Sequence, residues 1–150
     1  MKLLAFETAT EACSVAVWDS GRVLERFELA PRRHAELALP WADAVLAEAG
    51  IVRAQLDAIA VGRGPGAFTG VRLAIGLAQG IALGLDLPVL PVSTLAALAL
   101  RAPDDGRPIL AAIDARMGEV YAAAFGRDGA GVRPLSAERG AGPDAGELPG

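Results

Sequence analysis

The run Gly64-Pro65-Gly66-Ala67-Phe68-Thr69-Gly70 has the composition of a loop that joins a strand to a helix. Glycines allow positive φ and let the backbone approach another segment closely. We expect Thr69 to cap the following helix, whose first N–H groups could then bind an anion. No Gly-Lys-Ser/Thr follows, so the run is not a P-loop, and a purely structural turn is the alternative. Arg72, one turn into the helix, could orient this loop or meet a carboxylate of a partner.

Three glycines, Gly76, Gly80 and Gly84, recur every four residues in the same predicted helix. This spacing places them on one face. Each glycine destabilises a helix interior by up to about 1 kcal/mol relative to Ala, so three of them on one face indicate that close packing needs them there. A bare stripe lets another surface come close. That surface is either the protein's own sheet or a helix of another protein.

The residue types of common catalytic centres are scarce. His34 is the only histidine, whereas metal sites need several ligands at defined spacing, so we predict no metal ligand and place His34 at a helix start or on the surface. Cys13 lies in an apolar alternation and is predicted to be a small buried hydrophobe. Ser14 and Ser93 have no base partner of the kind that serine hydrolases use. We therefore predict no catalytic residue.

Composition narrows the classes of protein further. The 150 residues are 53% hydrophobic and 21% charged, which allows a buried core. The net charge of −4 and the absence of a basic run argue against strong direct RNA binding. A single cysteine and an N-terminus without a signal-peptide pattern fit the cytoplasm. The apolar stretch 73–100 is interrupted by Pro88 and Pro91, which predicts two helices joined by a strand and not a membrane span.

Hydrophobic periodicity predicts a mixed α/β lobe. In the helix expected from His34 to Ala49, Leu37, Trp41 and Val45 recur at four-residue spacing, and Gly50 suits the C-cap. Pro40 must kink this helix or lie near its true start. The predicted order is strands 2–7, 13–18 and 22–29, helix 34–49, strand 56–61, helix 69–84, strand 87–92, and a helix capped by Ser93 or Thr94 that ends near 101.

A second, incomplete copy of this plan follows the hinge-like stretch 104–108. Residues 110–114 resemble 3–7, and Phe125 follows Asp114 at the same distance as Trp18 follows Glu7. An accidental match of two hairpin lengths is the alternative. We predict a first lobe over 1–103, the start of a truncated second lobe over 104–135, and a Gly/Pro/Ala-rich tail over 136–150 that forms loop or disorder. A shortened chain would look like this.

The element order resembles the actin-like (ribonuclease H-like) ATPase architecture, in which an α/β lobe of mixed sheet and helices is followed by a second lobe of the same plan. Four stretches in matching order resemble the TsaB family, the non-catalytic partner subunits of the bacterial machinery that makes threonylcarbamoyladenosine in tRNA. They are Glu7-Thr8-Ala9-Thr10-Glu11-Ala12-Cys13-Ser14-Val15-Ala16, Gly62-Arg63-Gly64-Pro65-Gly66-Ala67-Phe68-Thr69-Gly70-Val71-Arg72, Pro91-Val92-Ser93-Thr94-Leu95 and Asp114-Ala115-Arg116-Met117-Gly118-Glu119-Val120-Tyr121.

In that architecture, hairpin loops of both lobes face a cleft that can hold phosphates. The resemblance therefore implies nucleotide or cleft positions at Glu7, Thr8, Thr10, Asp114 and Arg116. The family usually has Asp where this chain has Glu7, so the carboxylate here lies one methylene further out. We expect no cofactor of the chain's own, with ATP entering through a complex.

The resemblance also implies partners: a TsaD-like catalytic paralogue, a TsaE-like ATPase, tRNA only indirectly, and no membrane; a homodimer is also allowed. TsaD transfers threonylcarbamoyl to an adenosine beside the anticodon, and the chain itself would be an accessory subunit. The expected interface comprises His34, Leu37, Trp41, Val45, Arg72, Gly76, Gly80 and Gly84. The competing hypotheses are an actin-like ATPase acting alone and a metal-dependent glycoprotease-like hydrolase.

Overall fold

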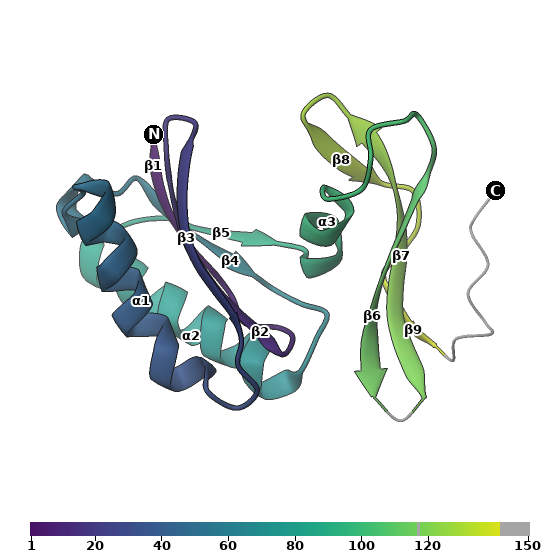
Figure 1. The fold of residues 1–150 in the computed structure, drawn as a ribbon, viewed down its shortest axis with the longest axis horizontal. Helices are drawn as coiled ribbons and strands as arrows, with labels where there is room; N and C mark the ends of the chain where they lie inside the picture. The colour runs from purple at the N-terminus through teal and green to yellow at the C-terminus, as the bar shows by residue number, and fades with distance from the viewer. Residues whose placement is uncertain (117, 142–150) are drawn as a thin grey trace. The chain divides into compact units, whose positions relative to one another are not determined.

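The chain forms two compact units in the computed structural model, which describes residues 1–116 and 118–141, with only the backbone for Arg116 and Ala141. The first unit comprises Met1–Arg63 and Ala67–Val92, and the second comprises Gly64–Gly66 and the chain from Ser93 onward. The second unit includes the last helix because that helix packs on the strands that follow it. The lobe boundary at 103 stays a prediction. Figure 1 traces both units.

A five-stranded mixed sheet forms the framework of the first unit, in the order β3-β2-β1-β4-β5. The first three strands make an antiparallel meander, and the last two run parallel to β1. Buried apolar residues alternate along β1 and β2, as expected of strands with one covered face. The strands are β1 (Lys2–Glu7), β2 (Ala12–Asp19), β3 (Arg22–Leu29), β4 (Ala58–Gly62) and β5 (Val89–Val92).

Two long helices cover one face of this sheet, as Figure 1 shows. Helix α1 spans His34–Ala49 and ends at Gly50, which adopts the left-handed C-cap conformation (φ 70°) that glycine allows. Helix α2 spans Phe68–Leu85 and turns Ala74, Ala78 and Ala82 toward the sheet. A short 3-10 turn, η1 (Arg53–Gln55), leads from α1 into β4. The core between the layers is built on large side chains of the strands, including Leu4, Phe6, Val15, Val17, Ile59 and Val61.

The second unit begins with a short helix, α3 (Thr94–Ala99), and continues as an antiparallel meander. Leu95 and Ala99 of α3 pack on Ala111, Ala123 and Phe125 of the strands. The strands are β6 (Ile109–Arg116), β7 (Glu119–Asp128), β8 (Gly131–Pro134) and β9 (Arg139–Ala141). Strand β8 pairs with the later half of β7, and β9 pairs with its beginning.

The mixed α/β class and most helix and strand positions agree with the prediction. Ser93 caps α3, since its Oγ accepts a hydrogen bond from Ala96 N–H at 3.2 Å. Helix α1 starts at His34 and continues through Pro40, so that proline does not mark the start of the helix.

Two local predictions were wrong. Thr69 does not cap α2: the N-cap is Ala67, in an extended conformation without a side-chain cap, because its N–H donates to Ala9 O. The part of the tail predicted as loop contains strand β9. It forms because the free edge of β7 supplies backbone partners and because Gly140 packs on the ring of Tyr121, 3.3 Å from where a Cβ would lie. The rest of the predicted tail, 142–150, lies outside the described residues.

The apolar stretch 73–100 divides into α2, β5 and α3, as predicted. Helix α2 alone, among the described residues, is long and apolar enough to cross a membrane, with a mean hydropathy of 1.5 over 18 residues. One such helix is weak evidence for a span. Only 17% of this window is buried inside the chain, so α2 presents unusually apolar surface for a helix that lies on a sheet.

Candidate functional site

The loop between β1 and β2 is anchored to the start of α2. Thr8 is fully buried, and its Oγ1 donates a hydrogen bond to Gly70 O at 2.5 Å. The next residue, Ala9, accepts a bond from Ala67 N–H at 2.7 Å. A Cβ on Gly70 would lie 2.0 Å from Thr8 O, so this close backbone approach requires glycine. One carbonyl of the loop, Ala9 O, and one carbonyl of the helix, Gly70 O, thus find partners across this contact.

His34 anchors the other side of the same loop to the start of α1. Its Nε2 lies 2.8 Å from Thr10 O and 3.2 Å from Ala12 O. Both neighbours are carbonyl oxygens, which only accept, so Nε2 carries the hydrogen in this arrangement. The predicted helix-start position of His34 is confirmed, while its ring is half-buried against its own chain.

Glu7 lies at the end of β1 and folds against the neighbouring strand β4. A Cβ on Gly62 would come within 1.1 Å of Glu7 Oε2, so the carboxylate occupies the space that any larger residue at position 62 would need. Sequence reasoning missed this pairing, although both residues end strands that run parallel and adjacent. The longer acid is accommodated because position 62 has no side chain.

The glycine-rich run 64–70 serves both units. Gly64 exchanges two bonds with Thr94: its N–H donates to Thr94 Oγ1 at 3.2 Å, and its carbonyl accepts from Thr94 N–H at 3.0 Å. Residues from Ala67 onward instead belong to the first unit. Arg72 lies over the ring of Phe68, 3.7 Å from its centroid, while Phe68 stays 67% exposed. Within the described contacts the run acts as a structural turn, and phosphate binding by Pro65, Gly66 and their neighbours stays a prediction.

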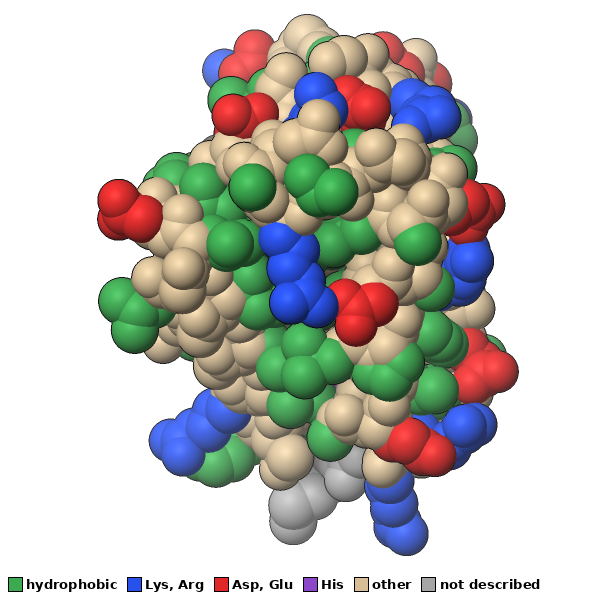
Figure 2. Space-filling view, turned by 90° about the vertical axis from the view of Figure 1, so that its left-hand side faces the viewer, with side chains coloured by type: hydrophobic (Ala, Val, Ile, Leu, Met, Phe, Trp, Pro, Cys, Tyr) green, Lys and Arg blue, Asp and Glu red, His purple; other side chains and the backbone are tan. Residues whose placement is uncertain are grey.

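The glycine stripe of α2 faces away from the sheet. Gly76, Gly80 and Gly84 are exposed, and no described atom lies within 4 Å of where their Cβ atoms would be. Packing of these glycines on the protein's own sheet is therefore excluded, and the alanine stripe takes that place. Leu83 beside them is 85% exposed. Figure 2 shows hydrophobic side chains gathered on this side of the molecule between scattered charges.

The residues of α1 named as interface candidates divide between surface and core. Leu37 and Trp41 are half-buried and retain some accessible surface. Val45 has none, because it lies in the core between α1 and the sheet, so its prediction as a partner contact was wrong. We call the outer side of α1 and α2, which includes Leu37, Trp41, Leu83 and the glycine stripe, the α1/α2 face.

The hairpin of the second unit holds the other predicted cleft residues. Asp114 is exposed near the end of β6, and the register shifts between Asp114 and Arg116. The side chain of Arg116 lies outside the described residues, so an Arg116–carboxylate contact is not tested. A nucleotide role for Glu7, Thr8, Thr10, Asp114 and Arg116 stays a prediction.

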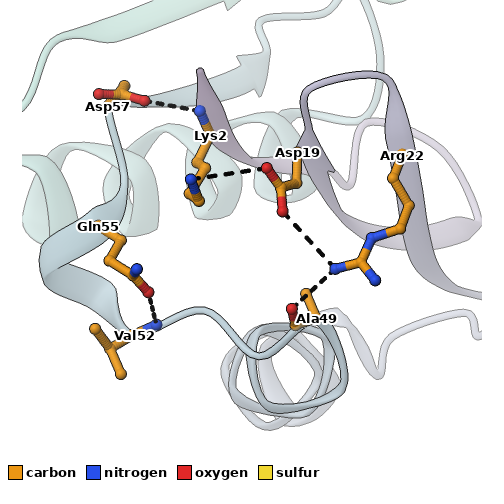
Figure 3. A network of polar contacts seen from close by, with 7 residues as sticks. All are labelled: Lys2, Asp19, Arg22, Ala49, Val52, Gln55 and Asp57. Atoms are coloured by element: carbon orange, nitrogen blue, oxygen red, sulfur yellow. Dashed lines mark hydrogen bonds and ion pairs between the residues drawn. The ribbon is translucent and has the colours of Figure 1, made fainter.

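A polar network lies at the other end of the β1–β2 hairpin (Figure 3). Asp19 bridges Lys2 and Arg22 at 3.8 and 3.7 Å, and Arg22 donates to Ala49 O at the end of α1. The Lys2 backbone N–H donates to Asp57 at 2.7 Å. These partly exposed contacts join three strands and a helix end, which is a structural role.

The described residues contain no group of three His, Cys, Asp or Glu side chains close enough to hold a metal ion. Cys13 is buried, and this burial, with Glu28 as the smaller cause, raises the pKa of its thiol. A raised pKa suppresses the reactive thiolate.

Comparisons with known proteins identify the family of this chain. The model of the TsaD family, described as tRNA N6-adenosine threonylcarbamoyltransferase, matches residues 27–139. The Escherichia coli (strain K12) tRNA threonylcarbamoyladenosine biosynthesis protein TsaB is 52% identical over 134 residues, which cover 88% of this chain. The chain belongs to the TsaD family, in its TsaB/YeaZ branch. TsaB of Haemophilus influenzae is 51% identical over 123 residues and 81% of the chain.

The solved structure of YeaZ from Pseudomonas aeruginosa agrees closely with this TsaB/YeaZ chain. It has a TM-score of 0.93 at 48% identity, over 99% of this chain and 70% of YeaZ. The predicted actin-like ATPase fold is confirmed by this match. The chain spans 58% of the E. coli and 52% of the H. influenzae protein, so it corresponds to little more than half of those relatives.

Proposed function

We propose that this chain is an accessory subunit for threonylcarbamoyladenosine formation in tRNA, and that it docks a TsaD-like catalytic paralogue through the α1/α2 face. Its relatives are named for that biosynthesis, and the family model describes the threonylcarbamoyltransferase. TsaD would carry out the transfer, a TsaE-like ATPase would act in the same complex, and the chain would touch tRNA only indirectly. Any ATP would enter through the complex.

The observation that carries the proposal is the bare glycine stripe on an apolar, mostly unburied helix. Gly76, Gly80 and Gly84 lower helix propensity without contacting anything in the described chain. Their cost is offset if another helix approaches closely along the stripe. A partner of the same fold would bring a comparable pair of helices to such a contact, and a second copy of this chain would bring the same pair.

The electrostatics of the face suit a protein partner better than RNA. Arg72 is the only charged residue within Phe68–Leu85. Glu36, Asp43 and Glu48 lie exposed on α1. Phosphate backbones need clustered basic residues, which this face lacks. An interface with an apolar centre and a charged rim fits the arrangement.

The test is Gly80→Leu, measured by calorimetric titration with a TsaD-like paralogue. Leucine improves helix propensity, and no described residue lies within 4 Å of where its Cβ would be, so the variant is expected to fold at least as stably as the parent. Its bulk separates the docking helices, and the affinity for the paralogue is expected to fall at least about tenfold, or ~1.4 kcal/mol.

Ala97→Leu, at an exposed position of α3, is the matched control and should bind like the parent. Light scattering of the chain alone and mixed with the paralogue distinguishes a homodimer from the expected heteromer. Undiminished affinity of Gly80→Leu would exclude the glycine stripe as the docking surface. Modification of tRNA by the chain without TsaD would overturn the accessory role.

A further inference from the structure

The β1–β2 loop (Thr8–Glu11) is bonded to the N-terminal ends of both helices of the α1/α2 face. Thr8 and Ala9 hold the start of α2. Thr10 holds the start of α1 through His34, and Glu11 O accepts from Ala30 N–H at 2.9 Å just before that helix. The two helices pack mainly on the sheet and touch each other little. The loop therefore links their first turns directly by hydrogen bonds, which their own contacts do not.

The connection is stiff on the α2 side. Thr8 and Ala9 are 0% and 1% exposed, and Gly70 leaves no space between the two backbones. A displacement of the loop therefore has to move the first turn of α2. On the α1 side, a single half-buried side chain, His34, holds two carbonyls on either side of the turn at Glu11.

We propose that His34 is a positioning residue, which fixes the β1–β2 loop and through it the relative placement of the first turns of α1 and α2 for the docking partner. The inference rests on the proposed function, since the partner is the TsaD-like paralogue. It assigns His34 a role inside the chain, in place of direct contact with that paralogue.

The N–H group at Nε2 of His34 is what fixes the loop. Two carbonyl oxygens converge on it, and a side chain without an N–H leaves both without that donor. A glutamine amide places an N–H at a similar distance from the backbone, whereas leucine fills the volume without a donor. His34→Leu and His34→Gln are thus a matched pair that separates the hydrogen bond from packing.

Thr8→Val tests the connection at a position that no partner can touch. Thr8 is fully buried, and valine keeps its shape while removing the donor to Gly70 O. If His34 acts through the loop, Thr8→Val and His34→Leu each weaken paralogue binding about tenfold, and the double variant loses less than the product of the two. His34→Gln should stay within about threefold of the parent.

A second measurement uses the isolated chain and does not depend on binding. Exchange of the Ala67 amide hydrogen, which is bonded to Ala9 O, should accelerate about tenfold or more in His34→Leu although position 34 lies on the other helix. The Ile59 amide, bonded to Pro88 O in the sheet, is the internal control and should keep its rate. The same amides in His34→Gln should exchange at the parent's rates.

The outcomes separate the two proposals. Parental affinity and Ala67 exchange in His34→Leu, with binding lost in Gly80→Leu, would overturn the positioning role and leave the docking face intact. Weakened binding in His34→Leu with parental affinity in Thr8→Val and unchanged Ala67 exchange would mean direct contact by His34, which also overturns the inference. If the parent chain does not bind the paralogue, the proposed function fails, and the positioning role fails with it.

Discussion

The two antiparallel meanders, β1–β3 and β6–β8, share a strand order but bury different residues. Glu7 pairs with a residue seven positions later, Ser14, whereas Asp114 pairs with a residue six positions later, Val120, so the pairing of the second hairpin is offset by one residue. A shift of one residue reverses the face on which later side chains lie. Phe125 is therefore in the core at 3% exposure, whereas Trp18, at the matching sequence distance, is 38% exposed on the face without helices.

The layers that cover the meanders also differ. The first unit has helices of 16 and 18 residues over a core of large aliphatic side chains. The second has a six-residue helix over a core with several alanines, in which Leu95 and Phe125 are the large members. The tightest contacts of glycines also lie in the first unit: Gly70, at the start of α2, meets the backbone of Thr8, and Gly62, at the end of β4, meets the side chain of Glu7. The comparison shows that two meanders with the same strand order can have different cores, because the helices that pack on them differ in length.

The largest effect is expected from Gly70→Ala in the first unit. The new Cβ would lie 2.0 Å from Thr8 O, and backbone cannot move away as a flexible side chain can. We expect the free energy of unfolding to fall by about 3 to 5 kcal/mol, measured by urea denaturation. Gly80→Ala on the same helix is the control, expected to stabilise by about 0.5 to 1 kcal/mol because its site is open. Equal effects of the two would contradict the close contact.

Phe125→Ala tests the core of the second unit. Removing the buried ring should cost about 3 kcal/mol of unfolding free energy, with loss of hydrogen-exchange protection along β6 and β7. Trp18→Ala removes a larger ring from a more exposed site and is expected to cost only about 1 kcal/mol. A larger loss for Trp18→Ala would show that the opposite face of the first sheet is also covered in solution.

Gly62→Ala should have a moderate effect, since it collides with the side chain of Glu7 and not with backbone. We expect a loss of about 1 to 2 kcal/mol in the parent and almost none in a Glu7→Ala background, measured as a double-mutant cycle. Additive losses would mean that the carboxylate does not lie against Gly62.

The smallest effect concerns Cys13 in β2. Because burial raises the pKa of its thiol, the folded protein should react slowly with thiol reagents at neutral pH. At alkaline pH the unfolded chain ionises first, so stability should fall as pH rises past the ordinary thiol pKa of about 8.5. Labelling by a thiol reagent should accelerate in Gly70→Ala and stay slow in Phe125→Ala. Cys13 becomes accessible only when the first sheet opens, and of the two variants only Gly70→Ala destabilises that sheet.

Sequence periodicity located most of the framework because its signals are local. The buried strand predicted over 2–7 and the alternating strand predicted over 22–29 match β1 and β3 to the residue, and the four-residue spacing in α1 with Gly50 as its cap predicted that helix to both ends. Ser93 was recognisable as a cap because its partner, Ala96, is three residues away. Elements whose residues depend on near neighbours were therefore accessible from sequence.

Features that depend on residues far away in the chain could not be predicted from the sequence. Thr69 looked like a cap, but the start of α2 is determined by Ala9, far back in the chain. Strand β9 has weak strand-forming residues and exists because β7 has a free edge. The spacing of Val45 matched that of Trp41 and could not distinguish the core side of α1 from its outer side. The Glu7–Gly62 contact depends on which strands become neighbours, which no local pattern encodes.

The largely unburied α2 has a consequence for the amount of this protein that a cell can maintain. An orphan copy exposes Leu83 and its apolar neighbours to chaperones and proteases, which act on such surfaces. We expect copies made in excess of their binding partner to be degraded or to aggregate. Abundance of the chain would then follow the supply of that partner, so stoichiometry would be set after translation.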